Sequence, residues 1–191
     1  MPKNLKQLEN EIFKCRKCSR LCQINPFPMP HIYYGDPKEV ELFCIGRNPG
    51  IEDSYDGIPL DSFMKLYHER WWECRVGKYL RSKLGDNIIL HKFFFTNICK
   101  CSSPKNANLF PDEKENCYPY LIEQIELIKP LMIVTISDDA YKMLHPKIKL
   151  GYFGKIAVVP LYHPSYFAYS KDKKAIEKQD DILKSIKEIF K

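Results

Sequence analysis

The chain has 191 residues, enough for one sizeable hydrophobic core, and its 45% hydrophobic and 13% aromatic content excludes a disordered protein. The formal net charge of +6 suits a polyanionic partner such as nucleic acid but does not require one. No run approaches the roughly 20 apolar residues of a membrane helix, and the first residues lack the apolar core of a secretion signal. We therefore expect no membrane partner and a location in a reducing cytoplasm.

Apolar periodicity predicts alternating helices and strands. In chain order these are a helix over 5–15, a strand over 41–46, a helix over 76–84, a strand over 92–96, a helix that includes 121–128, a strand over 131–136, a short helix over 138–144 capped by Ser137, a strand over 155–160 and a helix over 176–189. Continuous apolar strands that alternate with helices predict a three-layer α/β/α sandwich around a mostly parallel four-stranded sheet. No linker is long enough to divide the chain, so we expect residues 1–191 to form a single domain.

The eight cysteines include one informative motif, the CxxC of Cys15 and Cys18. Without a secretion signal, cysteines favour metal ligands and buried thiols over disulfides. The motif supplies two ligands, and the best candidates for the other two are Cys101 and Cys117. Cys99 lies only two residues before Cys101, so spacing alone does not decide which of the two is the ligand. Four thiolates can bind a structural zinc ion as readily as they bind an iron–sulfur centre.

Polar side chains follow each predicted strand, where parallel sheets bind their ligands. They are Asn48-Pro49-Gly50, Asn97, Ser137 and His163-Pro164-Ser165. An asparagine offers a donor and an acceptor side by side, as the edge of a nucleobase requires. A histidine acts as acid or base, or donates to a developing anion, near neutral pH. On turn statistics alone, Asn48 and Ser137 fit turn and cap roles equally well.

With these residues in view, the chain resembles the uracil-DNA glycosylase superfamily over about 15–167, and within it the iron–sulfur branch of the family 4 type. The resemblance rests on the CxxC, the turn Gly46-Arg47-Asn48-Pro49-Gly50, Thr96-Asn97 with Lys100-Cys101, Cys117, Lys129-Pro130 and His163-Pro164-Ser165. It implies a 4Fe–4S cluster held by Cys15, Cys18, Cys101 and Cys117. It also implies a monofunctional DNA repair enzyme, expected to be a monomer, that flips uracil or a related deaminated base out of DNA and hydrolyses its N-glycosidic bond.

The resemblance also implies roles for the residues at the strand ends. Asn97 reads the pyrimidine edge and His163 stabilises the departing base. The turn contacts the base through Gly46, Arg47, Pro49 and Gly50, and Ser165 joins them. Asn48 matches the turn of the mismatch-specific branch, in which this asparagine positions the attacking water. Arg47 replaces the acidic residue usual in the iron–sulfur branch, which leaves open a catalytically weak or inactive iron–sulfur nucleic-acid-binding protein of the same fold.

Three expectations concern the surroundings of the base and the DNA. The family's stacking phenylalanine segment is missing, and the spacing back from Asn97 implies an insertion after Asp53, with Trp72 as the stacking platform; core packing of both tryptophans is the alternative. Tyr166 or Phe167 is expected to fill the gap left by the flipped base. Lys171 is expected to touch phosphates, unless it belongs to an ordinary solvated helix start.

Overall fold

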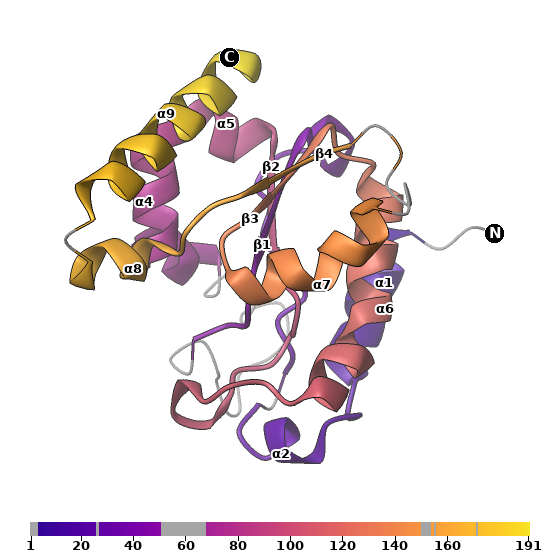
Figure 1. Ribbon diagram of the computed structural model, residues 1–191. Coiled ribbons are helices and arrows are strands. Elements are labelled where there is room, and N and C mark those ends of the chain that lie inside the picture. The colour runs from indigo at the N-terminus through magenta and orange to yellow at the C-terminus, as the bar shows by residue number, and fades with distance from the viewer. Residues whose placement is uncertain (1–3, 26, 51–67, 150–153, 155, 171) are drawn as a thin grey trace.

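The protein, described here by a computed structural model, is defined at residues 4–25, 27–50, 68–149, 154, 156–170 and 172–191. At its centre lies a parallel four-stranded sheet of strand order β2-β1-β3-β4 (Figure 1). The strands are β1 (Leu42–Gly46), β2 (Phe93–Asn97), β3 (Met132–Thr135) and β4 (Ala157–Pro160). The predicted four-stranded parallel sheet is therefore confirmed, with each strand near its expected place.

The sheet is covered on both faces because its central strands β1 and β3 are almost entirely apolar, with Thr135 as the polar exception. All five residues of β1 are buried. Phe43 and Ile45 point into one hydrophobic core, whereas Leu42 and Cys44 point into the other, as the two-residue period of a strand requires. Continuous apolar runs of this kind occur in strands that have helices on both sides.

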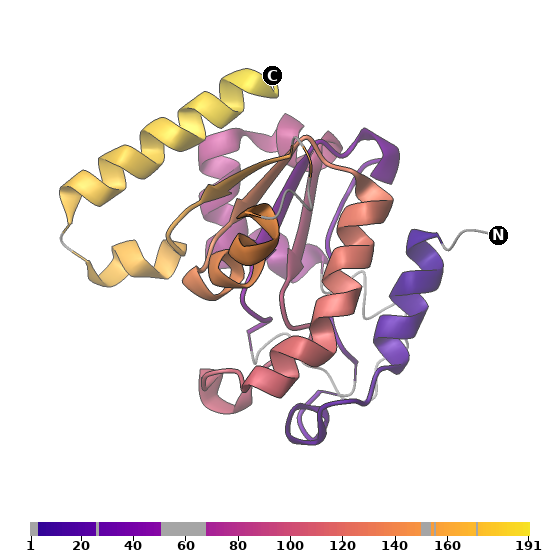
Figure 2. The same ribbon diagram turned by 45° about the vertical axis from the view of Figure 1, so that its right-hand side comes forward.

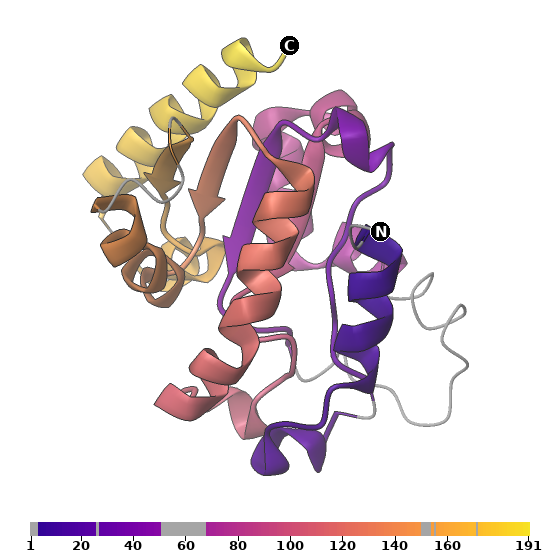
Figure 3. The same cartoon turned by 90° about the vertical axis from the view of Figure 1, so that its right-hand side faces the viewer.

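The helices form the two outer layers, which confirms the predicted α/β/α sandwich. One core contains residues of α4 (Arg75–Leu84), α5 (Asp86–His91) and α9 (Lys173–Ile189), and the other contains residues of α6 (Pro111–Ile128) and α7 (Asp138–Lys149). Helix α1 (Leu5–Lys14) lies beside α6 (Figures 2 and 3). None of the described helices combines the length and the apolar character needed to cross a membrane.

Several helices differ from the sequence-based expectation. Helix α6 begins at Pro111, because proline fits the first helical position and the Glu113 carboxylate accepts the Phe110 backbone N–H at 2.7 Å. Its first half is polar, so apolar periodicity misses it. The segment after His163, expected as a loop, forms the short helix α8 (Pro164–Tyr169), and α2 (Ser19–Cys22) lies beyond the CxxC. The expected insertion after Asp53 and the phosphate contact of Lys171 lie outside the described residues.

Candidate active site

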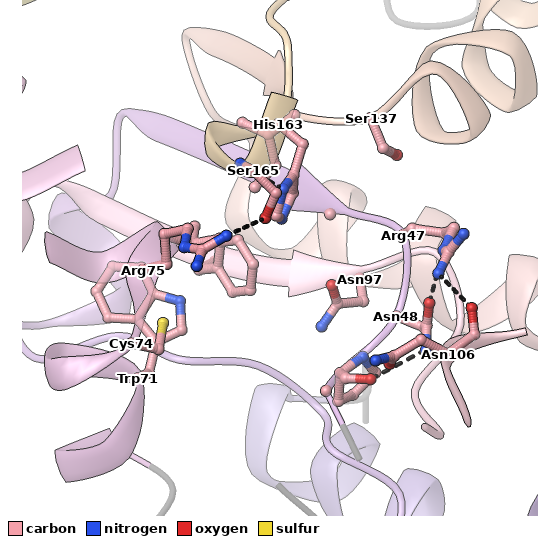
Figure 4. Close-up of a pocket in the computed structure, with 16 residues that line it drawn as sticks. Arg47, Asn48, Trp71, Cys74, Arg75, Asn97, Asn106, Ser137, His163 and Ser165 are labelled. Carbon is pink, nitrogen blue, oxygen red and sulfur yellow. Dashed lines mark hydrogen bonds between the residues drawn. The ribbon is translucent and has the colours of Figure 1, made fainter. Parts of the chain in front are cut away.

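A cavity of about 580 Å³ opens at the carboxyl edge of the sheet (Figure 4). Its wall takes residues from the ends of all four strands and from the start of α4. They are Gly46, Arg47, Asn48, Pro49, Gly50, Trp71, Cys74, Arg75, Val76, Phe95, Asn97, Asn106, Ile136, Ser137, His163 and Ser165. The structure thus brings together all the polar residues that follow the predicted strands, together with the five residues of the β1 turn.

Asn97 lies in the middle of the cavity, at the end of β2 and opposite Gly46 of β1. It is only 3% exposed, and none of the residues drawn in Figure 4 hydrogen-bonds its carboxamide. A Cβ atom at position 46 would collide with Asn97 Oδ1 and approach Phe95 Cζ to 3.2 Å, so this close approach needs glycine. The carboxamide keeps a donor and an acceptor available to a ligand.

His163 caps the N-terminus of α8 and also faces the cavity. Its Nδ1 accepts the backbone N–H of Ser165 at 3.1 Å, so the neutral ring carries its hydrogen on Nε2. Burial lowers the pKa of His163 below its ordinary value, and the nearby cations Arg47 and Arg75 lower it further. The ring is therefore held as a neutral donor at Nε2 near pH 7.

The β1 turn is fixed by hydrogen bonds within itself and to the loop after β2. Arg47 Nε donates to Asn48 Oδ1 at 2.8 Å, and its Nη2 donates to the backbone oxygen of Asn106 at 3.3 Å. Asn48 Nδ2 donates to the Pro49 carbonyl at 3.0 Å and to Ser103 Oγ at 3.4 Å. Ser137, which lines the cavity, also caps α7 as predicted, with its Oγ accepting the Ala140 N–H at 3.0 Å.

Several wall residues were not singled out from the sequence, Arg75 among them, and the choice between Trp71 and Trp72 as the stacking residue was left open there. Arg75, the exposed first residue of α4, donates from Nη1 to Ser165 Oγ at 3.3 Å, but a single arginine in a polar stretch carries no pattern that would reveal it. Trp71 lines the cavity at 4% exposure, and within the described part of the chain its Nε1 has no hydrogen-bond partner. The stacking residue expected from the sequence, Trp72, lies outside this wall; the guanidinium of Arg81 covers its ring at 3.6 Å.

The two aromatic residues expected at the DNA lie on α8, outside the cavity wall. Tyr166 is 41% exposed and lines a neighbouring groove. Phe167 packs against Tyr79 of α4, with ring centroids 6.3 Å apart. Of the two, Tyr166 has the more accessible ring.

A second cluster of side chains gathers the cysteines predicted as ligands. Five cysteines line one small cavity between α1, α2, the loop after β2 and α6: Cys15, Cys18, Cys22, Cys101 and Cys117. Cys99 is fully buried outside this wall, with its Sγ 3.9 Å from that of Cys117. The N-terminal segment is therefore placed against the middle of the chain, and Cys101 rather than Cys99 faces the shared space.

Burial affects the protonation of the thiols in this cavity. It raises the pKa of Cys18 to about 11 and moves the pKa of Cys101 in the same direction, so it favours their neutral form, whereas the contact with Cys99 lowers the pKa of Cys117. Metal binding would reverse this preference, because a metal binds the thiolate. In the described ranges no three His, Cys, Asp or Glu side chains have the arrangement of a single-ion site.

The chain is similar in sequence to proteins of one known family. A family model of the Uracil DNA glycosylase superfamily matches residues 32–187. The chain is 27% identical over 204 residues to a type-4 uracil-DNA glycosylase of Sulfurisphaera tokodaii, with 97% of this chain and 84% of that protein covered. It is 36% identical over 178 residues to one of Pyrobaculum aerophilum, with 85% and 83% covered. The crystal structure of wild-type Pedobacter heparinus SMUG2 is similar at a TM-score of 0.48 and 17% identity, over 82% of this chain and 78% of that chain. The chain belongs to the uracil-DNA glycosylase superfamily, on the type-4 branch.

Proposed function

We propose that this protein is a uracil-DNA glycosylase that flips uracil out of DNA and hydrolyses its N-glycosidic bond. The observation that carries this function is that Asn97 and His163 line the same cavity of about 580 Å³. The cavity has room for a nucleobase, and its amide and imidazole groups match the polar edge of uracil. The type-4 uracil-DNA glycosylases named above support the same function. We take residues 1–191 as one catalytic unit that acts as a monomer on DNA in the cytoplasm.

Recognition begins with the flipped base in the cavity. Asn97 donates from Nδ2 and accepts at Oδ1, so it pairs with a carbonyl oxygen and the adjacent ring N–H of a pyrimidine. Trp71 brings an indole N–H that is buried without a partner within the described part of the chain. Because this nitrogen is closed off from solvent, a base in the cavity would meet Trp71 through its ring and not through the N–H. We therefore assign Trp71, with Phe95, to the wall that contacts the base.

Cleavage needs stabilisation of the departing base. As the bond from the sugar C1′ to the base nitrogen breaks, its electron pair moves onto the base and the sugar becomes cation-like. His163 donates from Nε2 to the base oxygen on which this charge builds up, and a preoriented donor in a dry cavity is effective there. The neutral ring is suited to this role because its Nδ1 is held by the Ser165 N–H.

Water completes the reaction at C1′ and loses a proton to the surrounding solvent. Asn48 is placed in the β1 turn to hold this water, since its Oδ1 has a second lone pair beside the hydrogen bond from Arg47. Of the residues that line the cavity, none is a lysine, so the described wall offers no side-chain amine for a covalent intermediate with the sugar. These two features support a monofunctional glycosylase.

The cysteine cavity is the proposed site of a 4Fe–4S cluster, held by Cys15, Cys18, Cys101 and Cys117. Thiolates are the usual ligands of such a cluster, and the four proposed ligands line one small cavity. When bound, the cluster would fasten the segment around α1 and α2 to α6 and to the loop after β2. That loop continues from Asn97, so the fastening also supports the base-reading edge.

A second candidate function is a catalytically weak nucleic-acid-binding protein of the same fold. The observation that favours it is the hydrogen bond from Arg47 to Asn48 Oδ1, which occupies part of the acceptor that the water needs. The two candidates differ in turnover and agree in DNA binding.

The deciding experiment is base release from oligonucleotides by protein purified without oxygen. Single-stranded and duplex substrates carry uracil, hypoxanthine, xanthine or mismatched thymine. We expect uracil release that Asn97→Ala and His163→Ala reduce by about a hundredfold or more, as for loss of a strong transition-state donor. Uracil DNA bound by the wild-type protein without release would favour the second candidate. Full activity in both variants would remove the assigned roles.

A further inference from the structure

Tyr162 and Tyr166 form an exposed stack of rings next to the active-site cavity. Their ring centroids lie 4.7 Å apart and their planes differ by 15°. The two residues remain 51% and 41% exposed. Phe167 packs edge-on against both rings, at 6.1 Å and 5.5 Å, and supports them from α8. Two large aromatic faces are thus held in position while part of their surface stays open.

The backbone of Tyr162 is held by the buried side-chain amide of Gln179 on α9. Gln179, only 2% exposed, accepts the Tyr162 backbone N–H at 2.7 Å and donates to the Tyr162 backbone oxygen at 3.1 Å. Its Nε2 also donates to the hydroxyl of Tyr79 at 3.0 Å. A ring that is already held in place loses little conformational freedom on binding, which favours affinity.

The stack forms one wall of a groove of about 620 Å³ between α7, the end of β4, α8 and α9. This groove, called the tyrosine groove below, shares Arg47, Ser137 and His163 with the active-site cavity. A group held in the tyrosine groove therefore lies immediately beside a base held in the active site. Its volume is in the range of pockets that hold small molecules.

Charge decides which part of DNA fits the tyrosine groove. Its α7 side presents the carboxylates of Asp138 and Asp139, which form ion pairs with Lys142 at 2.5 Å and Lys114 at 2.7 Å. Within the lining these carboxylates offset the cations Arg47 and Lys178, so the groove has no positive excess that would favour a phosphate inside it, whereas a neutral base stacks on tyrosine whatever its identity. The exposed Lys178 on the α9 side is available to a phosphate at the rim.

We propose that the tyrosine groove binds the nucleobase next to the flipped one on the same strand, stacked on Tyr162 and Tyr166. This proposal rests on the proposed function, because it takes the neighbouring cavity as the site of the flipped base. The same strand is favoured because the two cavities share a wall and adjacent nucleotides are joined by a single phosphate. The groove thereby gives the protein affinity for DNA in which the base beside the uracil is also unstacked.

The test uses Tyr162→Ala and Tyr166→Ala, with Tyr169→Ala as the matched control. Tyr169 is an 84% exposed tyrosine of the same helix α8 that does not line the groove. The dissociation constant is measured by fluorescence anisotropy on single-stranded oligonucleotides that carry a non-hydrolysable uracil nucleotide, either intact or with the base on one side of the uracil replaced by a stable abasic analogue. We expect each groove variant to weaken binding about 5-fold to 100-fold on intact DNA, as for loss of a base–aromatic stack.

The abasic substrates make the test specific. Removing the correct neighbouring base should weaken binding by wild type and by Tyr169→Ala to the same extent, and should weaken the groove variants no further. Groove variants that bind like Tyr169→Ala would overturn the proposal. So would removal of a neighbouring base that weakens binding by the groove variants as much as it weakens binding by the wild type. Binding is read without turnover, so a wild type that releases no uracil defeats the proposed function and leaves this comparison valid.

Discussion

The guanidinium of Arg47 lies against the amide of Asn48, with Nε donating to Oδ1 at 2.8 Å. The other end of the same amide donates to the Pro49 carbonyl and to Ser103 Oγ. Both amide hydrogens and one oxygen lone pair are therefore used, which fixes the orientation of Asn48. The remaining lone pair is the position that we assign to the attacking water.

Replacing Arg47 tests whether this hydrogen bond helps or hinders catalysis. Arg47→Leu should slow single-turnover uracil release about tenfold, the effect of one lost hydrogen bond from a charged group at a partly exposed position. Arg47→Lys keeps the charge but lacks the Nε donor, so it should be slowed similarly if orientation is the cause. Faster release by Arg47→Leu would mean that Arg47 blocks the water, which contradicts the assigned role.

The pH dependence follows from His163. Its pKa lies below the ordinary value of 6.5 because of burial and the nearby cations Arg47 and Arg75. Protonation at Nδ1 would remove the acceptor for the Ser165 N–H. The rate should therefore stay on its plateau as pH falls through 6.5 and decline only through the lowered pKa. Removing one cation raises that pKa, so Arg75→Gln should move the acid limb of the pH–rate profile upward. A wild-type limb at or above pH 6.5 contradicts this account.

Of the two adjacent tryptophans, Trp71 lines the active-site cavity and Trp72 does not, so their variants can be compared directly. Trp71→Ala should raise the KM for uracil DNA by roughly 5-fold to 10-fold, because it removes an aromatic ring that lines the cavity. Trp72→Ala should leave KM unchanged, since Trp72 packs on Arg81 away from the cavity. Both variants are compared by thermal unfolding to account for stability. The opposite pattern would restore Trp72 as the stacking residue.

The site residues that could be predicted from the sequence are those that directly follow a strand. Asn97 and His163 follow apolar runs, and the carboxyl ends of parallel strands share one edge, so their meeting could be foreseen. Trp71 and Trp72 could not be distinguished by counting, because residues 68–73 are helical and neighbours on a helix point about 100° apart. Arg75 reaches the cavity only through the packing of α4, which leaves no periodic signal in the sequence.

Removing cysteines one at a time tests the proposed cluster. Anaerobically purified wild type should be brown and hold about four irons per chain. Serine in place of any proposed ligand should reduce both the iron content and the visible absorbance, and these ligands are Cys15, Cys18, Cys101 and Cys117. Cys99→Ala is the control, because Cys99 lies outside the shared cavity. Cys22→Ala decides whether the fifth cysteine of the wall takes part. Colourless protein with about one zinc per chain would contradict the cluster.

Gly46 offers the sharpest test of how Asn97 is placed. A Cβ atom at position 46 would run into Asn97 Oδ1 and crowd Phe95, so Gly46→Ala should displace the carboxamide from the centre of the cavity. We expect kcat/KM for uracil release to fall about a hundredfold, comparable to loss of one strong transition-state contact. The control is a double-mutant cycle, because Gly46→Ala should cost little further activity in an Asn97→Ala background. Independent, additive losses would mean that Gly46 acts on the base or the water directly and not through Asn97.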